Sequence, residues 1–429
     1  MTASAARARW AISAQFFTNG VLGGSLLPRL PEIKESFALS DTAYGLVVVA
    51  LPLGSVLAAA VAGPLIRRFG AIRVAVSFTV VYALLLAAAG FAPSAIVFAP
   101  VMLLAGVSDA ILDSGQNVHG MAVERWYGKS IINSMHAAWS VGATVGGVIG
   151  ATSAGLGIPI GWQMAAGAVV WSAVAVLAGR GAAVPSRYVR AATPEADPPT
   201  AEPASAGPGA VGPGAGGVGA DAGDMGPAAS GAGSVSGPAR RPFPWRLFLP
   251  LAVLAIAGTL VEDVANNWVT LYLNRDMGVA IGLAGMGFAV MLGAQFVGRI
   301  LGDPMTDRWG RSAVARTGGF MIAAGGLLAV VAPVWWIAMA GFALAGFGSA
   351  TLVPAAFAAA DALPGVPHGT GVAMVGWWMR LGFLLTSPAI GVVADAAGLR
   401  AGLLLLVGAG VVALVLAHRR RGTAPGRGS

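Results

Sequence analysis

Two aspartates lie one helical turn apart inside a long apolar run of the sequence. Asp109 and Asp113 are four residues apart in the run from 95 to 117, and Asn117 continues the same helix face. An ionised side chain at the middle of a bilayer costs about 2.5–3.5 kcal/mol, so each acid needs a reason to be there. Two neighbouring carboxyls can load and release a proton. The alternative is one acid at an aqueous mouth and the other in a structural pair.

Polar residues also interrupt the apolar runs of the second half of the chain. Glu262 and Asn266 lie one turn apart, and Arg380 is a basic residue deep within an apolar run. Arg380 can hold an anionic substrate or neutralise Asp113 or Glu262. Trp377 can stack on a sugar or ring, although Trp is also common in packing and at membrane interfaces.

The first half adds three polar residues to this set. Gln15 and Asn19 lie in the first apolar run, and His136 lies in the fifth. A single buried histidine is more often a packing residue. We nevertheless predict a ring of polar side chains near the middle of the membrane, which binds substrate and protons. Its candidate members are Gln15, Asn19, Asp113, Asn117, His136, Glu262, Asn266, Trp377 and Arg380.

A composition of 56% hydrophobic and only 10% charged residues, over 429 residues, places these groups in a membrane protein. A soluble domain carries about 25% charged residues. The mean hydropathy is +0.77. The chain has no cysteine, which excludes disulfides and thiolate metal sites. The net charge of +8 arises from basic residues in short loops, which indicates membrane orientation and not nucleic-acid binding.

About twelve apolar runs reach the roughly 20 residues that a membrane-spanning helix needs. The predicted fold is therefore an all-α integral membrane protein with twelve transmembrane helices in two pseudo-symmetric six-helix bundles. The predicted parts are a first bundle at 1–183, a disordered cytoplasmic linker at 184–244, a second bundle at 245–418 and a basic tail at 419–429. The linker is rich in Ala, Gly, Pro and Ser and cannot bury a core. The distribution of Lys and Arg places both termini in the cytoplasm.

The two halves repeat one pattern. A charged stretch at 298–311 follows an apolar run, and a weaker copy stands at 63–70. Aligning Gly310 on Gly70 gives an offset of 310 − 70 = 240 residues, and the same offset aligns Gly285 on Gly45. Parallel repeats of this kind are typical of one large class of transporters.

The paired loops resemble the signature of the major facilitator superfamily, which reads Gly, three residues, Asp-Arg, one residue, Gly-Arg. The second copy fits it through Asp307, Arg308, Gly310 and Arg311, with Asp303 in the leading Gly position. The first copy keeps Gly63, Arg68 and Gly70, with Arg67 in place of the family's Asp. Further stretches are similar to a bacterial branch near the fucose permeases, much of it without assigned substrates. They include Asn19-Gly20, the run 29–34, Leu112-Asp113, Val123-Glu124-Arg125, the run 136–140, Glu262 with Trp268, and Gly382-Phe383 with Pro388.

The resemblance implies a secondary active transporter that works by alternating access in a bacterial-type cytoplasmic (inner) membrane. It implies proton-coupled movement of a small organic solute, with uptake of a sugar-like or other small metabolite favoured. Asp113 lies on the family's matching position and is our predicted proton carrier. The loop residues are expected to latch one conformation, although basic loops can also serve orientation alone. The predicted partners are a small-molecule substrate, protons and the lipid bilayer, with no nucleic acid, cofactor or metal, and the chain is expected to be a monomer.

Other functions compete with this one. The stretch 142–147 partly resembles a fifth-helix antiporter motif, but Gly147 stands where that motif has Pro, so proton-driven efflux of a small hydrophobic compound is the weaker alternative. A membrane receptor or an intramembrane enzyme would be a different class. The sequence has no His-Glu-x-x-His run, nucleophile elbow or nucleotide-binding loop, so we do not expect an enzyme.

Overall fold

The computed structural model describes residues 3–128, 131–186, 188, 243–364, 366 and 370–419. All regular structure in these ranges is helical. Most of the predicted linker at 184–244 and of the basic tail at 419–429 lies outside the described residues.

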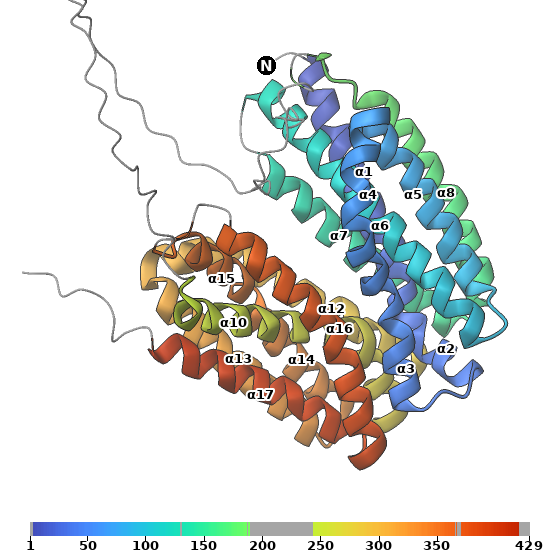
Figure 1. The fold of residues 1–429 in the computed structure, drawn as a ribbon. Helices are drawn as coiled ribbons and strands as arrows, with labels where there is room; N and C mark the ends of the chain where they lie inside the picture. Colours follow the sequence, from blue (N-terminus) through green and yellow to red (C-terminus); the bar gives the residue numbers. More distant parts are fainter. Residues whose placement is uncertain are drawn as a thin grey trace, which may run out of the picture.

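The helices form two bundles (Figure 1). The first contains α1 (Ala3–Leu26), η1 (Leu27–Arg29), α2 (Leu30–Ser36), α3 (Asp41–Val48), α4 (Ala50–Phe69), α5 (Ala71–Gly90), α6 (Ala95–Tyr127), α7 (Ile132–Gly155) and α8 (Ile160–Gly181). The second contains α10 (Trp245–Asp263), η2 (Val264–Trp268), α11 (Val269–Leu271), η3 (Tyr272–Asp276), α12 (Ile281–Trp309), α13 (Arg311–Val331), α14 (Trp335–Ser349), α15 (Leu352–Asp361), α16 (Thr370–Ala397) and α17 (Leu399–Arg419).

Within the described residues, 10 helical segments are long and apolar enough to cross a membrane. The other two spans expected from the sequence fall in α1 and α7, which carry Asn19 and His136. Some spans consist of two consecutive helices, such as α3 with α4 and α14 with α15. The all-α fold with paired six-helix bundles is thereby confirmed.

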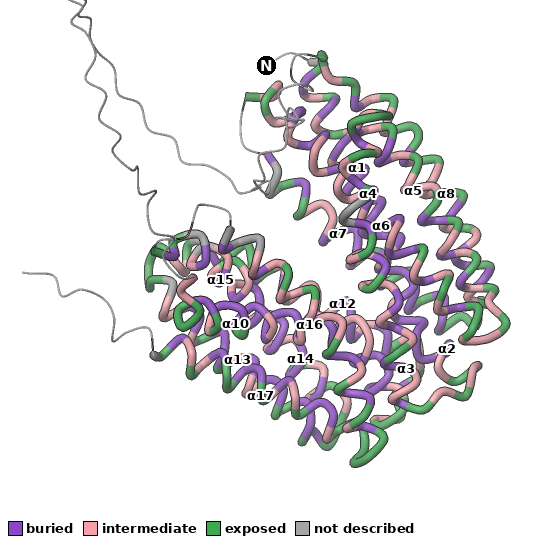
Figure 2. Tube along the Cα trace, viewed as in Figure 1, coloured by how far each residue is buried: buried purple, intermediate pink, exposed green. Residues whose placement is uncertain are grey.

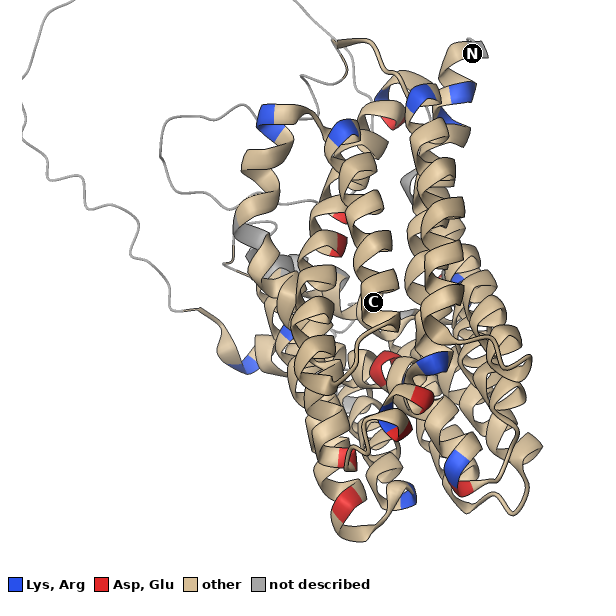
Figure 3. Cartoon of the chain, turned by 90° about the vertical axis from the view of Figure 1, so that its right-hand side faces the viewer, with Lys and Arg blue, Asp and Glu red and all other residues tan. Residues whose placement is uncertain are grey.

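Apolar side chains cover the outside of the bundles as well as their interior. Leu84 on α5 is 58% exposed, Val169 on α8 is 73% exposed and Phe320 on α13 is 60% exposed. Figure 2 shows buried residues where helices face one another and exposed ones along the outer surfaces. An apolar outer surface of this extent is stable only against lipid. Long stretches of the helices carry no Lys, Arg, Asp or Glu (Figure 3).

The sequence repeat is visible in the backbone. Each signature loop is a single glycine between two helices: Gly70 joins α4 to α5 with a φ of 87°, and Gly310 joins α12 to α13 with a φ of 78°. A positive φ strains residues that carry a Cβ, so glycine is required at both places. The offset of 310 − 70 = 240 residues therefore relates equivalent turns of the two bundles.

The second aligned pair, Gly45 and Gly285, brings the bundles together. A Cβ added at Gly45 would lie 2.6 Å from the carbonyl oxygen of Ser387 on α16. A Cβ added at Gly285 would lie 2.7 Å from the Cβ of Ala151 on α7. Both glycines thus permit close contact between helices of different bundles. Gly146, in the glycine-rich stretch of α7, packs directly against the backbone of Val21 on α1.

The two ends of the molecule differ. We call the end that holds Arg68 and Arg308 the basic end, and the end that holds Asp41 and Arg275 the closed end. The bundles meet around α3, α12 and α16 at the closed end and diverge toward the basic end (Figure 1).

Candidate functional site

Three connected cavities extend from the middle of the molecule to the basic end. The central cavity has a volume of about 350 Å³, the middle cavity about 410 Å³ and the mouth about 810 Å³. Asn19, Asp109 and Arg380 line both the central and the middle cavity. His136 and Arg299 line both the middle cavity and the mouth. The space between the bundles therefore widens toward the basic end.

Charged side chains from both bundles reach the central cavity. Asp109 comes from α6 of the first bundle, whereas Asp263 on α10 and Arg380 on α16 come from the second. The rest of the lining is mainly apolar and includes Leu86 and Phe288. A largely apolar cavity with a few convergent polar groups is the usual form of a small-molecule site.

The predicted acid pair faces this space. Asp113 lines the middle cavity together with Asp109, which lies one turn away on α6. The Nδ2 of Asn117 donates a hydrogen bond of 3.1 Å to Oδ1 of Asp113. No ion pair involves Asp109 or Asp113 within the part of the chain that the structure describes. Two carboxyls that form no ion pair and line a cavity open to water are suited to bind and release protons.

Four other predicted members of the polar ring also reach the cavities. Asn19 and Asn266 line the central cavity, and Arg380 lines the central and middle cavities. His136 lines the middle cavity and the mouth, with its ring edge-on to Phe16 at a centroid distance of 5.2 Å. Among the described residues, Arg380 forms no ion pair with Asp113 or with Glu262, so the neutralising role considered for it is not realised in this conformation.

Four predicted members line none of the three cavities, which corrects the proposed ring: Asn117, whose side chain is hydrogen-bonded to Asp113, and the three residues described next. Gln15 is fully buried, and its Nε2 donates to the carbonyl of Ala175 on α8. Trp377 is 59% exposed and lines none of the three cavities. Glu262 also stands outside the three linings, and its Oε1 accepts a hydrogen bond of 2.8 Å from Arg299. The reason in each case is helix rotation, which hydropathy does not determine.

Asp263 is the functional candidate that sequence reasoning missed. It is 3% exposed and lines the central cavity. The Nδ2 of Asn267 donates to its Oδ1 at 2.9 Å, and the hydroxyl of Ser387 donates to its Oδ2 at 2.6 Å. A signal was available in the sequence, because Asp263 and Asn267 have the same spacing as Asp113 and Asn117 and form the same hydrogen bond.

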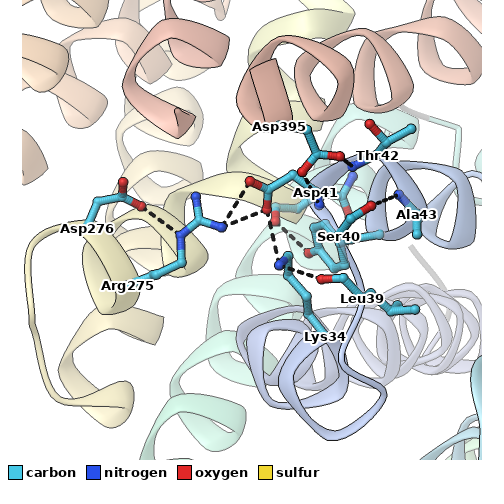
Figure 4. A network of polar contacts seen from close by, with 11 residues as sticks. Lys34, Leu39, Ser40, Asp41, Thr42, Ala43, Arg275, Asp276 and Asp395 are labelled. Atoms are coloured by element: carbon cyan, nitrogen blue, oxygen red, sulfur yellow. Dashed lines mark hydrogen bonds and ion pairs between the residues drawn. The ribbon is translucent and has the colours of Figure 1, made fainter. Parts of the chain in front are cut away.

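A network of charged groups joins the bundles at the closed end (Figure 4). Arg275 of the second bundle donates through Nη1 to both carboxylate oxygens of Asp41 in the first, at 2.7 and 3.0 Å. Asp395 on α16 accepts the backbone N–H groups of Asp41 and Thr42, each at 2.8 Å. Lys34 adds an ion pair of 3.2 Å with Asp41. A carboxylate at a helix N-terminus is favoured by the helix dipole, so Asp395 holds the start of α3 across the bundle boundary.

The predicted latch residues stand at the opposite, basic end. Arg68, Asp307, Arg308 and Gly310 are exposed, and Asp307 lines the mouth. Gly63 lies within the last two turns of α4, and Gly70 directly follows that helix. The side chains of Asp303 and Arg311 lie outside what the structure describes. Among the described residues, no ion pair involves Arg68, Asp307 or Arg308, so the latch remains a prediction and is not engaged while the closed-end network is formed.

Comparison with known proteins gives matches over most of the chain. The sequence model described as "Major Facilitator Superfamily" matches residues 12–300 and 251–428. The chain is 28% identical over 389 residues to "Uncharacterized transporter y4wD" of Sinorhizobium fredii, covering 91% of this chain and 92% of that protein. It is 25% identical over 407 residues to "Membrane protein MosC" of Rhizobium meliloti, covering 94% and 87%.

Solved structures share the fold. The nucleoside transporter NupG, as a D323A mutant, is 13% identical with a TM-score of 0.69, covering 97% of this chain and 99% of NupG. A D-xylose–proton symporter is 12% identical with a TM-score of 0.62, covering 98% and 97%. FucP in an outward conformation is 15% identical with a TM-score of 0.56, covering 96% and 98%. At these identities the likeness concerns the fold alone, so the expected position near the fucose permeases rests only on a distant structural neighbour.

Proposed function

Since the chain belongs to the Major Facilitator Superfamily, we propose that this multi-pass membrane transporter moves a small organic solute by proton-coupled alternating access. Membership of a transporter family also confirms that the chain is not an enzyme. One observation carries the proposal: a cavity lined by acids of both bundles opens through the basic end, while the closed-end network seals the other.

The basic end is the cytoplasmic one in this proposal. Lys and Arg are retained on the cytoplasmic side of membrane proteins. The described conformation is then open to the cytoplasm and closed to the outside of a bacterial-type inner membrane, with both termini inside. The basic-end residues separate in this state, and they are expected to meet in the opposite one.

The central cavity supports a solute of metabolite size. Its volume of about 350 Å³ falls within the range of small-molecule sites. Asn19, Asn266 and Arg380 offer hydrogen-bond donors, and Trp139 and Phe288 offer apolar ring surfaces. Hydroxyl groups on a compact carbon skeleton fit such a lining, so a sugar-like or other small metabolite is the proposed cargo, and uptake the proposed direction.

Proton coupling is assigned to the acid pair on α6. Alternating access driven by protons needs a carboxyl that is charged in one part of the cycle and neutral in another. Asp113 is the proposed carrier, with Asp109 one turn away and Asn117 hydrogen-bonded to it. Both acids lie beside the passage through which water and protons arrive from the basic end.

The direct test is proton movement driven by substrate. A metabolite-uptake screen in a deletion strain identifies a substrate, and purified protein is then reconstituted into vesicles that contain a pH-sensitive dye. Addition of that substrate is expected to move protons in the same direction as the solute. Binding without flux of solute would indicate a receptor, and solute flux with no proton movement would remove the coupling from the proposal.

Asp307→Asn is expected to slow transport by roughly tenfold without abolishing substrate binding. The physical reason is loss of a charge-assisted contact, worth about 1.5–3 kcal/mol, in the conformation whose basic end is closed. The measurement compares initial transport rates and equilibrium binding at matched expression. Glu35→Gln is the matched control, because Glu35 is an exposed acid at the other end of the molecule. If Asp307→Asn transports at the full rate, the loop is not a conformational latch and serves only to orient the protein in the membrane.

A further inference from the structure

Asp263 connects the central cavity with the seam between α10 and α16. Its two carboxylate oxygens accept hydrogen bonds from Asn267 and Ser387, as described above. Ser387 in turn accepts from Nε1 of Trp268 at 3.1 Å. An ionised Asp263 therefore orders three side chains that lie between the cavity and the closed end.

Residues of the first bundle contact Asn267, Trp268 and Ser387 directly. The hydroxyl of Tyr44 on α3 donates to the backbone carbonyl of Asn267 at 2.6 Å. The Tyr44 ring meets Trp268 edge-on at a centroid distance of 5.2 Å. Gly45 packs directly against the carbonyl of Ser387. Just beyond, Asp41 and its partners form the closed-end network (Figure 4).

The helix that carries these groups is irregular at this level. Two backbone hydrogen bonds here join residues five apart instead of four. The N–H of Val269 donates to the carbonyl of Val264, and the N–H of Met277 donates to the carbonyl of Tyr272. Such π-helical turns are rare, concentrate at functional sites and loosen the regular hydrogen-bond ladder. The segment from 264 to 276 therefore departs from a regular α-helix beside the residues that meet the first bundle.

We propose that Asp263 is a positioning residue that couples the contents of the central cavity to closure of the closed end. As an anion it accepts two hydrogen bonds and holds Asn267 and Ser387 where Tyr44 and Gly45 dock. A proton on Asp263 cancels that charge, turns one carboxyl oxygen into a donor and weakens the hydrogen bonds from Asn267 and Ser387, so the seam no longer fits α3. The inference presupposes alternating access, but it does not require Asp263 to be the transported proton's carrier.

Other charged groups do not replace Asp263 in this role. Arg380 on α16 and Asp109 on α6 line the same cavity without an ion pair to Asp263 among the described residues. Glu262, its neighbour on α10, is bound to Arg299. The helix α14 carries no charged residue, and the charged residue of α15, Asp361, is the last residue of that helix. On α17 the described charged residues, Arg400 and His418, stand near the two ends of the helix.

The test uses the cysteine-free chain with one reporter, Ser55→Cys, because Ser55 lines the central and middle cavities. A membrane-impermeant thiol reagent probes it through the closed end in intact cells and through the basic end in inverted vesicles. The parent is expected to react from the basic end. With Asp263→Asn, the reaction rate through the closed end is expected to rise about tenfold or more, while the rate through the basic end falls.

Two further variants separate coupling from a general loss of structure. Asp263→Glu keeps the charge and is expected to restore the parent pattern, whereas Ser387→Ala removes one donor and is expected to act in the direction of Asp263→Asn. Glu262→Gln neutralises the adjacent acid and is expected to leave closed-end reactivity unchanged. A closed-end rate within about twofold of the parent in folded Asp263→Asn overturns the proposal. If that variant does not fold, the same result in Ser387→Ala overturns it. The assay needs no substrate, so a failure of proton coupling is detected separately by the flux experiment.

Discussion

Asp113→Asn is expected to abolish uphill accumulation of the substrate while leaving substrate binding intact. The change removes the proton-binding group but keeps the size and polarity of the side chain beside Asn117. For one proton per solute, each unit of pH gradient is worth about 1.4 kcal/mol, which supports about tenfold accumulation. Under the same pH gradient, the Asp113→Asn variant is expected to reach about equal substrate concentrations inside and outside the vesicles.

The measurement uses proteoliposomes with an imposed pH gradient and the labelled substrate from the uptake screen. Exchange between equal internal and external pools should persist in Asp113→Asn, since that reaction needs no net proton movement. Asp109→Asn is the comparison variant, because Asp109 lies one turn away and lines the same middle cavity. If Asp113→Asn still accumulates substrate with an unchanged pH profile, Asp113 is not the proton carrier. The carrier is then another acid, or the protein is a uniporter.

Gly391→Ala is expected to hold the closed end open. A Cβ at Gly391 would lie 2.4 Å from the carbonyl oxygen of Asp41 and 3.0 Å from the Cα of Thr42, so α3 and α16 could no longer approach as they do. Overpacking of this kind costs about 1–3 kcal/mol, which shifts an equilibrium by about 5- to 150-fold. Alanine favours helix more than glycine does, so loss of the helix itself is not the cause.

The same Ser55→Cys reporter measures this effect as a rise in closed-end reactivity. Gly408→Ala on α17 is the matched control, because nothing lies within 4 Å of a Cβ at that position. Transport is expected to fall in Gly391→Ala, since the cycle needs both ends to close in turn. Equal closed-end reactivity in Gly391→Ala and Gly408→Ala would show that the contact between α3 and α16 at Gly391 does not limit closure of the closed end.

The lengths of the apolar runs and the charged residues in the loops between them were sufficient to predict the number of spans, the two bundles and the repeat. The 240-residue offset paired Gly70 with Gly310, and the structure shows that each is a turn with positive φ between two helices. Asp113, Asn19 and Arg380 were found because a polar residue in an apolar run is costly wherever its side chain points.

The direction in which each helix face points could not be obtained in this way. Gln15 turns into its own bundle, Trp377 turns away from the cavities, and Asp263 turns into the central one. Those directions depend on how helices from distant parts of the chain pack against each other, and periodicity is weak in spans that are apolar on every side.

A membrane protein with twelve membrane-spanning helices in two related halves could be predicted from the residues alone, because insertion into a bilayer depends on local apolar length and charge. Which end is sealed, and by which groups, became visible only in the packed bundles. Asp41 meets Arg275 across 234 residues of chain and Asp395 across 354. Contacts at such separations leave no local pattern, because each partner resembles an ordinary surface charge until the bundles bring them together.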